Sequence, residues 1–337
     1  MRIWLLLVLC VHLAVGQNTS GEKHKKIHGV SWVASGSKPT ADVMKSVEEA
    51  SVNWLCFMPY GFSSNDDPNL KFNSERQWVG ETSEGIRHCT SMAHDLGYSV
   101  AIKPHIWLFN GSYTGHWSFD NEDDWATLEA SYTQYIITFA EIAEEEGAEL
   151  FILGTELEKF VEQRPEYWFD LIDSVRTVYS GMLTYAANWD EYNRVPFWKE
   201  LDYIGIDAYF PLTDNPKTTA EKIRKIWLKQ YAVIDGFANE VNRPVLFTEY
   251  GYRSVYGGFA EPWDSSRRKD YDIATQLNGY IGLYRAVWQQ KSFAGGFLWK
   301  WFDHPESAGG TGHSGFTPQN KPSLEVIRDY FTDAIEP

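Results

Sequence analysis

The chain has 337 residues, with 30 Lys and Arg against 46 Asp and Glu, so its formal net charge at pH 7 is −16. The acids are spread along the whole sequence, and such a chain would be repelled by nucleic acid and by anionic membrane surfaces. Aromatic residues make up 16% of the chain, including 15 Trp. A core alone rarely needs so many rings, whereas a sugar-binding cleft uses them because the C–H faces of a pyranose stack on aromatic faces.

The N-terminus predicts a secretory signal peptide over residues 1–16. Met1 and Arg2 precede an apolar run from residue 3 to residue 15, and the small residue Gly16 stands before a polar segment. The run is too short for a typical membrane span, although an uncleaved anchor is the alternative. We therefore expect a secreted, extracellular protein with a short extension over residues 17–26. Two N-glycosylation sequons begin at Asn18 and Asn110.

After this extension the chain alternates short apolar runs with amphipathic helical segments, a pattern typical of βα units around a parallel sheet. Eight runs are predicted as strands, namely residues 27–33, 53–58, 99–104, 149–154, 182–187, 203–208, 245–248 and 295–300. Clear helical periodicity covers residues 123–146 and 271–289. An open doubly wound sheet is the other arrangement, but no glycine-rich phosphate loop follows the first strand. The sequence therefore predicts one (β/α)8 TIM barrel, of class α/β, over residues 27–337.

Two glutamates follow predicted strands directly. Glu156 comes after the fourth run and Glu249 after the seventh. Reacting groups of such barrels lie at the C-terminal ends of strands, so these two carboxyl groups should face each other across the barrel mouth. A pair of carboxyl groups about 5–5.5 Å apart supports glycoside hydrolysis with retention of configuration, and this is the separation we expect.

Five phrases in barrel order carry a resemblance to a known family. They are Lys103-Pro104-His105, Gly154-Thr155-Glu156-Leu157, the segment 202–209, the segment 247–254 and the segment 296–301. Together they resemble glycoside hydrolase family 113, a clan A group known chiefly for endo-β-1,4-mannanases. The resemblance covers nearly the whole chain after the extension.

The resemblance implies a retaining mechanism with Glu156 as acid/base and Glu249 as nucleophile. Many clan A enzymes have Asn before the acid/base, whereas this chain has Thr155, as the family 113 phrase does. The hydrogen bond to the sugar 2-hydroxyl must then come from another group, and Asn188 after the fifth strand is a candidate.

Further residues at strand ends and in loops are candidates for supporting roles. Tyr209 could hydrogen-bond the nucleophile, and Trp299 could form a platform under the sugar. Lys103 and His105 could bind hydroxyl groups or lower the charge density around the glutamates. The remaining substrate-binding candidates are aromatic residues expected around the cleft: Trp107, Trp117, Trp189, Tyr252 and Trp263.

Other chemistries find no support in the sequence. The nine His show no His-Glu-x-x-His spacing for a metal, and the Gly-x-Ser-x-Gly motif of serine hydrolases is absent. Glycoside hydrolysis needs no cofactor. Cys56 and Cys89 remain after signal cleavage, either as a disulfide or as two buried thiols.

The sequence thus predicts a monomeric, secreted endo-β-1,4-mannanase acting on a β-linked polysaccharide or oligosaccharide. The alternatives are an exo-acting β-mannosidase, a β-glycosidase of another sugar, and a catalytically silent carbohydrate-binding barrel.

Overall fold

A computed structural model describes residues 26–109, 111–264 and 270–332. Its centre is a closed barrel of eight strands, in which each pair of neighbours is parallel. Around the barrel the strands are β1 (Ile27–Val33), β2 (Trp54–Phe57), β5 (Ser99–Ile102), β7 (Leu150–Thr155), β8 (Met182–Asn188), β9 (Ile204–Asp207), β10 (Val245–Tyr250) and β11 (Phe293–Phe302). The predicted TIM barrel is therefore confirmed, and each of the eight predicted runs overlaps one barrel strand.

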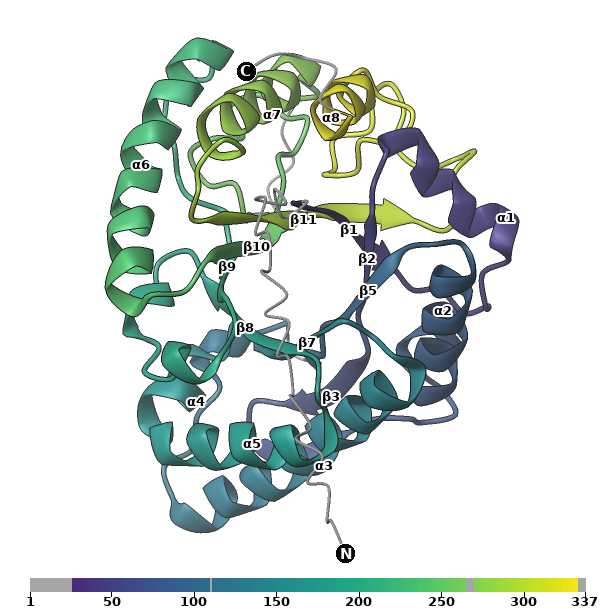
Figure 1. Cartoon of the computed structure of the whole chain (residues 1–337), viewed down its shortest axis with the longest axis vertical. Helices are drawn as coiled ribbons and strands as arrows, with labels where there is room; N and C mark the ends of the chain where they lie inside the picture. Colours follow the sequence, from purple (N-terminus) through teal and green to yellow (C-terminus); the bar gives the residue numbers. More distant parts are fainter. Residues whose placement is uncertain (1–25, 110, 265–269, 333–337) are drawn as a thin grey trace, which may run out of the picture.

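Helices form a ring outside the barrel (Figure 1). They are α1 (Ala41–Met44), α2 (Ser83–Asp95), α3 (Glu122–Glu146), α4 (Glu158–Gln163), α5 (Pro165–Val178), α6 (Ala220–Val241), α7 (Ile273–Val287) and α8 (Ser323–Phe331), with short 3-10 turns between them. Local signals set their ends. The side chain of Asn121 caps α3 by accepting from the Asp124 N–H, and Gly147, with a φ of +72°, ends it.

Two apolar layers hold the barrel together. The larger lies between strands and helices, and the smaller fills the barrel interior. The inner layer consists of Ile27, Cys56, Met58, Ala101, Leu150, Ile152, Ala186, Leu246 and Phe297. Closure of the barrel depends on Gly295, since a Cβ there would come within 2.2 Å of the Ile27 carbonyl oxygen on β1. Cys56 and Cys89 are buried free thiols, so the disulfide alternative is not realised.

A small second sheet that the sequence analysis missed stands beside the barrel. It consists of β3 (Tyr60–Ser64), β4 (Asp67–Lys71) and β6 (His105–Leu108), with β3 in the middle. β3 follows barrel strand β2 in the chain, and β6 follows barrel strand β5. β3 and β6 pair with each other in parallel. This sheet places His105 and Trp107 beside the barrel mouth.

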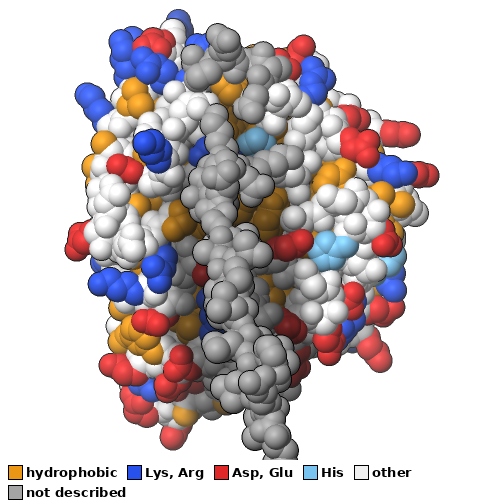
Figure 2. All heavy atoms as spheres, in the orientation of Figure 1, with side chains coloured by type: hydrophobic (Ala, Val, Ile, Leu, Met, Phe, Trp, Pro, Cys, Tyr) orange, Lys and Arg blue, Asp and Glu red, His pale blue; other side chains and the backbone are white. Residues whose placement is uncertain are grey.

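Charged side chains of both signs are interspersed on the face of the molecule drawn in Figure 2. Within the described residues, no helix combines the length and the apolar character that crossing a membrane requires. The predicted signal peptide and the extension up to residue 25 lie outside the described residues, as does Asn110.

Candidate active site

Both glutamates stand where a barrel strand departs from regular pairing. The register between β7 and β8 shifts between Ile152 and Thr155, just before Glu156. The register between β10 and β9 shifts between Phe247 and Glu249. In a regular strand, successive side chains point alternately to the two faces of the sheet. A register irregularity at the rim of a barrel can change the direction of a side chain there.

The backbone of Glu156 has an uncommon conformation for a residue with a side chain. Its φ is +51°, in the left-handed region, and its N–H donates to the Ala186 carbonyl oxygen at 2.8 Å. Its own carbonyl oxygen accepts from Thr114 Oγ1 at 3.3 Å. Strain of this kind persists where neighbouring contacts fix the backbone, and it is concentrated at functional sites.

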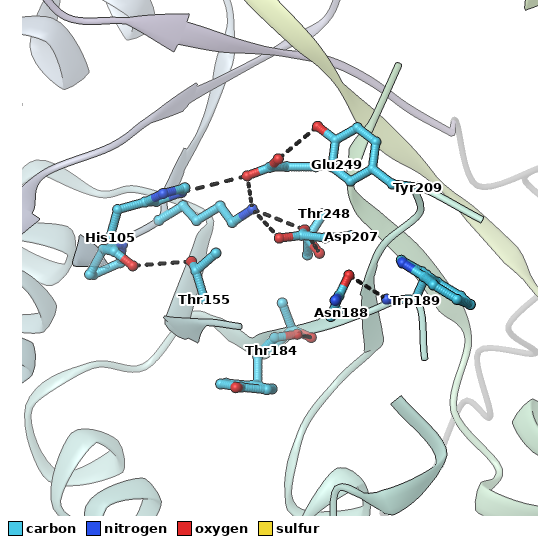
Figure 3. A network of polar contacts seen from close by, with 12 residues as sticks. His105, Thr155, Thr184, Asn188, Trp189, Asp207, Tyr209, Thr248 and Glu249 are labelled. Atoms are coloured by element: carbon cyan, nitrogen blue, oxygen red, sulfur yellow. Dashed lines mark hydrogen bonds and ion pairs between the residues drawn. The ribbon is translucent and has the colours of Figure 1, made fainter. Parts of the chain in front are cut away.

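The Glu249 carboxylate is held from two sides, and each oxygen accepts one hydrogen bond. Lys103 Nζ donates to Oε1 at 2.6 Å, and the Tyr209 hydroxyl donates to Oε2 at 2.8 Å. Figure 3 shows the rings of Tyr209 and His105 approaching this carboxylate. These two hydrogen bonds fix the position of the carboxylate, as a nucleophile requires.

Asp207, the last residue of β9, shares the Lys103 ammonium with Glu249. Lys103 Nζ lies 3.0 and 3.1 Å from the two Asp207 oxygens, and Thr248 Oγ1 donates to Asp207 Oδ1 at 2.7 Å. Lys103 and Asp207 are fully buried. Burial lowers the pKa of Lys103, but the adjacent Asp207 and Glu249 carboxylates outweigh burial, so that its pKa is raised. Burial and the Glu249 charge raise the pKa of Asp207 to about 7.

Within the described part of the chain, no cation forms an ion pair with Glu156. Burial, followed by repulsion from Asp207 and Glu249, raises its pKa well above the usual value for a glutamate. A carboxyl group that keeps its proton near neutral pH can act as a general acid. The two glutamates are thus placed in contrasting environments, the difference expected of an acid/base and a nucleophile.

Both glutamates line one cavity of about 340 Å³, within the usual size range of ligand sites. The other lining residues include Tyr60, His105, Trp107, Tyr113, Thr114, Thr155, Tyr209, Trp263, Trp299 and Phe316. The cavity is therefore lined by two carboxyl groups and many aromatic rings. It lies at the end of the barrel to which β7, β10 and β11 contribute lining residues at or near their C-terminal ends.

A family model of glycoside hydrolase family 113 matches residues 32–321, which is most of the chain. The chain belongs to glycoside hydrolase family 113. A search of curated protein sequences returns no match.

Solved structures place this family 113 hydrolase among β-mannanases in fold. The family 113 β-mannanase from Alicyclobacillus acidocaldarius, in complex with ManMIm, has a TM-score of 0.81 at 24% identity, covering 92% of this chain and 98% of that chain. A complex of a family 113 β-1,4-mannanase has a TM-score of 0.80 at 21% identity, covering 91% and 99%. A family 5 mannosidase from Rhizomucor miehei has a TM-score of 0.66 at 11% identity, covering 91% and 93%. At these identities the likeness concerns the fold.

Five of the predicted supporting residues line the cavity of this hydrolase: His105, Trp107, Tyr209, Trp263 and Trp299. Lys103 lies beneath it, and its contacts match the predicted role of lowering the charge density around the glutamates rather than that of binding hydroxyl groups. The Trp107 and Trp263 side chains are 54% and 43% exposed.

His105 is a neutral ring facing the site. Burial, followed by the charges of Lys103 and Lys300, holds the pKa of His105 well below its usual value. Its Nε2 lies 3.7 Å from Glu249 Oε1, too far for a hydrogen bond, and finds no hydrogen-bond partner among the described residues. This nitrogen is therefore a buried polar atom without a hydrogen-bond partner among the described residues.

Four candidates lie elsewhere than the sequence analysis expected, namely Tyr252, Asn188, Trp189 and Trp117. Tyr252 is 4% exposed and its hydroxyl accepts from Trp227 Nε1 at 2.7 Å, so it belongs to the core. Asn188 is not among the residues that line the cavity; its Nδ2 donates to the Tyr113 hydroxyl at 3.0 Å and its Oδ1 accepts from the Trp189 N–H. Trp189 stacks on Trp263, with ring centroids 5.3 Å apart, and so supports a cavity residue from behind.

Trp117, the last aromatic candidate, is 1% exposed and packs in the core between strands and helices. The two candidate glycosylation sites, Asn18 and Asn110, lie outside the described residues. Among the described residues no group of three or more His, Cys, Asp or Glu is arranged to hold a metal ion.

Sequence reasoning missed Asp207, Tyr60, Tyr113 and Phe316. Asp207 offered a signal, since an acid ends an otherwise apolar strand there. Tyr60 and Tyr113 lie in segments whose position depends on the second sheet and on the Asn188 contact. Phe316 reaches the site through its edge contact with Tyr209, with centroids 5.8 Å apart, and no local pattern indicates that contact.

Proposed function

We propose that this family 113 glycoside hydrolase is a retaining endo-β-1,4-mannanase in which Glu249 is the nucleophile and Glu156 the acid/base. The observation that carries the proposal is the contrast between two glutamates lining one cavity: Glu249 is bonded to a buried ammonium and a phenol, while Glu156 has a raised pKa. The names of the structurally similar family 113 enzymes support β-1,4-linked mannan as the substrate.

The proposed reaction has two steps. Glu156 donates its proton to the glycosidic oxygen as the bond to the anomeric carbon breaks, and a Glu249 oxygen bonds to that carbon. Glu156, now a carboxylate, then removes a proton from water, whose oxygen attacks the same carbon and releases Glu249. Lys103 and Tyr209 hold the nucleophile in place in both steps. His105 lines the same cavity as both glutamates.

Removal of each carboxyl group in turn tests these roles. The wild type is first assayed on mannan, glucomannan, xylan and cellulose, and oligosaccharide release from mannan is the expected result. Aryl glycosides of the preferred sugar then serve as substrates for the variants. We expect Glu249→Ala to lose turnover and to give the α-glycosyl azide with external azide, because azide enters on the face the carboxylate occupied.

Glu156→Ala should instead form the β-glycosyl azide, because azide replaces water at the covalent intermediate and its attack needs no general base. The control is Glu162→Ala, which removes a carboxylate paired with Lys159 and Arg194 on the surface. Full activity of Glu249→Ala, or the same anomer from both variants, would contradict the assignment. Binding of mannan without any product would favour the silent carbohydrate-binding barrel.

The proposal includes secretion, which rests on the apolar run of residues 3–15 and on Gly16. Protein recovered from the medium of a secreting eukaryotic host should begin near Gln17, as measured by N-terminal sequencing. Deletion of residues 1–16 should retain the protein inside the cells. A secreted protein that still carries Met1 would contradict cleavage.

A further inference from the structure

Lys321 is a buried cation that the mechanism described above does not use. It stands shortly before α8 and is 4% exposed. Its Nζ donates to Ser254 Oγ at 2.9 Å and to the Gly315 carbonyl oxygen at 2.8 Å, and no carboxylate among the described residues pairs with it. Burial, followed by repulsion from Arg253, lowers the pKa of Lys321 to about 7. A buried ammonium whose partners are all neutral costs free energy, so stability alone does not account for this side chain.

The two hydrogen bonds of Lys321 join two loops of the chain. Ser254 belongs to the loop that follows β10, the strand that carries Glu249, and Gly315 belongs to the segment between β11 and α8. Ser254 is fully buried, and its hydroxyl donates to the His313 carbonyl oxygen at 2.8 Å while it accepts from Lys321. One ammonium and one hydroxyl thus hold residues 313 and 315 against the loop that continues the nucleophile's strand.

A second buried side chain joins the same two loops. Gln276 of α7 is fully buried, and its Nε2 donates to the carbonyl oxygens of Tyr252 and Phe316, each at 2.8 Å. Its Oε1 accepts from Ser323 Oγ at 2.8 Å, where α8 begins beside α7 (Figure 1). The backbone of Phe316 is therefore held at its own carbonyl by Gln276 and at the preceding carbonyl by Lys321.

Phe316 connects these contacts with the carboxylate of the nucleophile. Its ring lines the catalytic cavity and meets the Tyr209 ring edge-on, with centroids 5.8 Å apart. The Tyr209 hydroxyl in turn donates to Glu249 Oε2 at 2.8 Å, as Figure 3 shows. Phe316 also packs closely on the backbone after Glu249, since a Cβ at Gly251 would lie 3.3 Å from its ring. A displacement of Phe316 would therefore reach the phenol that orients the nucleophile.

We propose that Lys321 is a positioning residue for the nucleophile, acting on Glu249 through Phe316 and Tyr209. The inference rests on the function proposed above and adds a residue to its active site. Small displacements of a reacting group cost a large part of the rate, even when the altered residue touches no substrate. Loss of the ammonium should therefore slow the step in which a Glu249 oxygen bonds to the anomeric carbon.

Kinetics of Lys321→Met on an aryl glycoside test the inference. Methionine keeps the length of the side chain and removes the donor. We expect kcat/KM, which reports the attack of Glu249, to fall by about tenfold at a temperature well below the Tm of both proteins. Ser254→Ala removes one acceptor of Lys321 and should give a smaller loss in the same direction. It also provides the test if Lys321→Met does not fold.

The variant Tyr209→Phe separates positioning from general damage. It removes the hydroxyl that binds Glu249 and keeps the ring that Phe316 contacts. In the Tyr209→Phe background the contact through which Lys321 acts is already lost. Addition of Lys321→Met or of Ser254→Ala to Tyr209→Phe should therefore lower kcat/KM by less than about twofold.

Lys26 offers a matched control, because its Nζ also donates only to neutral groups, the carbonyl oxygens of Gln290 and Phe293. Phe293 begins β11, so this contact lies at the opposite end of the barrel from the glutamates. Lys26→Met should lower Tm without a change in kcat/KM.

Two results would overturn the inference and leave the two-glutamate mechanism intact. One is wild-type kcat/KM in Ser254→Ala and in folded Lys321→Met. The other is a loss in the Tyr209→Phe background as large as in the wild type, which would show that Lys321 acts by another route. Failure of the wild type to hydrolyse any aryl glycoside would instead contradict the proposed function itself.

Discussion

Lys103 is a buried cation with two carboxylate partners, Asp207 and Glu249. A buried ion pair is expensive to form unless its geometry and remaining hydrogen bonds compensate, and here Thr248 and Tyr209 provide further donors. One ammonium cannot neutralise two carboxylates. The excess negative charge also affects Glu156, the third acid of the site. Burial is the largest cause that raises the pKa of Glu156, and repulsion from Asp207 is the second. We therefore expect Asp207 to position Lys103 and to help keep the proposed acid/base, Glu156, protonated.

The substitution Asp207→Asn should move the alkaline limb of the pH profile of kcat/KM to lower pH. Loss of the Asp207 charge removes a repulsion that raises the pKa of Glu156, so Glu156 loses its proton at a lower pH. The rate at the optimum should also fall, by up to about 100-fold, because Lys103 loses one of its two anchors. Initial rates on an aryl glycoside over the active pH range measure both effects.

The control for this variant is Glu162→Gln, which removes one negative charge from a surface ion pair. It should leave the alkaline limb where it is. If Asp207→Asn slows the reaction equally at every pH, then Asp207 contributes structure alone, and the proposed effect on Glu156 is wrong.

The barrel strands show which parts of the active site a local sequence pattern can predict. Glu156 and Glu249 each follow an apolar run long enough to be recognised as a strand, so their position at the barrel rim could be predicted. The register shifts next to these glutamates could not be predicted, because a register shift depends on the neighbouring strand. The second sheet was missed for the same reason: β3 pairs with β6, about 45 residues later in the chain, and its sequence Tyr60-Gly-Phe-Ser-Ser64 has few apolar residues.

The supporting residues divide along similar lines. His105, Tyr209 and Trp299 were predicted because they stand at or next to the ends of the predicted strands 99–104, 203–208 and 295–300, where a barrel carries its functional groups. Tyr252 stands only three residues after Glu249, yet its side chain turns into the core toward Trp227. Distance along the chain from a catalytic residue therefore says little about which way a side chain faces.

The molecule as a whole combines a net charge of −16 with several buried acids. Burial is the largest cause that raises the pKa of four of these acids. The pKa of Asp207 and of Glu81 rises to about 7, that of Glu191 rises to about 8, and that of Glu156 rises well above its usual value. A carboxyl group whose folded pKa exceeds its unfolded pKa stabilises the fold below the unfolded value, and that stabilisation is lost as the pH rises through the folded value. We therefore expect the free energy of unfolding to decrease between about pH 5 and about pH 8.

Glu191 allows a test outside the catalytic pair. Its side chain is 2% exposed, one oxygen accepts from the Asn188 N–H at 2.8 Å, and the other has no hydrogen-bond partner among the described residues. Glu158 and Asp190 raise its pKa further, and Arg194 opposes them. Glu191→Gln keeps the acceptor and cannot ionise, so it should raise Tm by a few degrees near pH 8 and by less near pH 5, as measured by calorimetry.

The exposed carboxylate of Glu200 provides the control, and Glu200→Gln should shift Tm equally at both pH values. Parallel Tm curves for the wild type and Glu191→Gln would show that Glu191 does not titrate in this range, and would contradict the prediction.

The sequence by itself determined the eight strands, the order of the βα units and the two glutamates at the strand ends, because each rests on periodicity and adjacency along the chain. Only the tertiary structure decided that Lys103, Asp207 and Glu249 share one buried network, that the Asn188 side chain donates to the Tyr113 hydroxyl, and that a second sheet stands beside the barrel. The physical reason is that charge pairing, burial and cavity shape depend on groups 40 to 146 residues apart in sequence, as the contacts of Tyr209 and of Lys103 with Glu249 show.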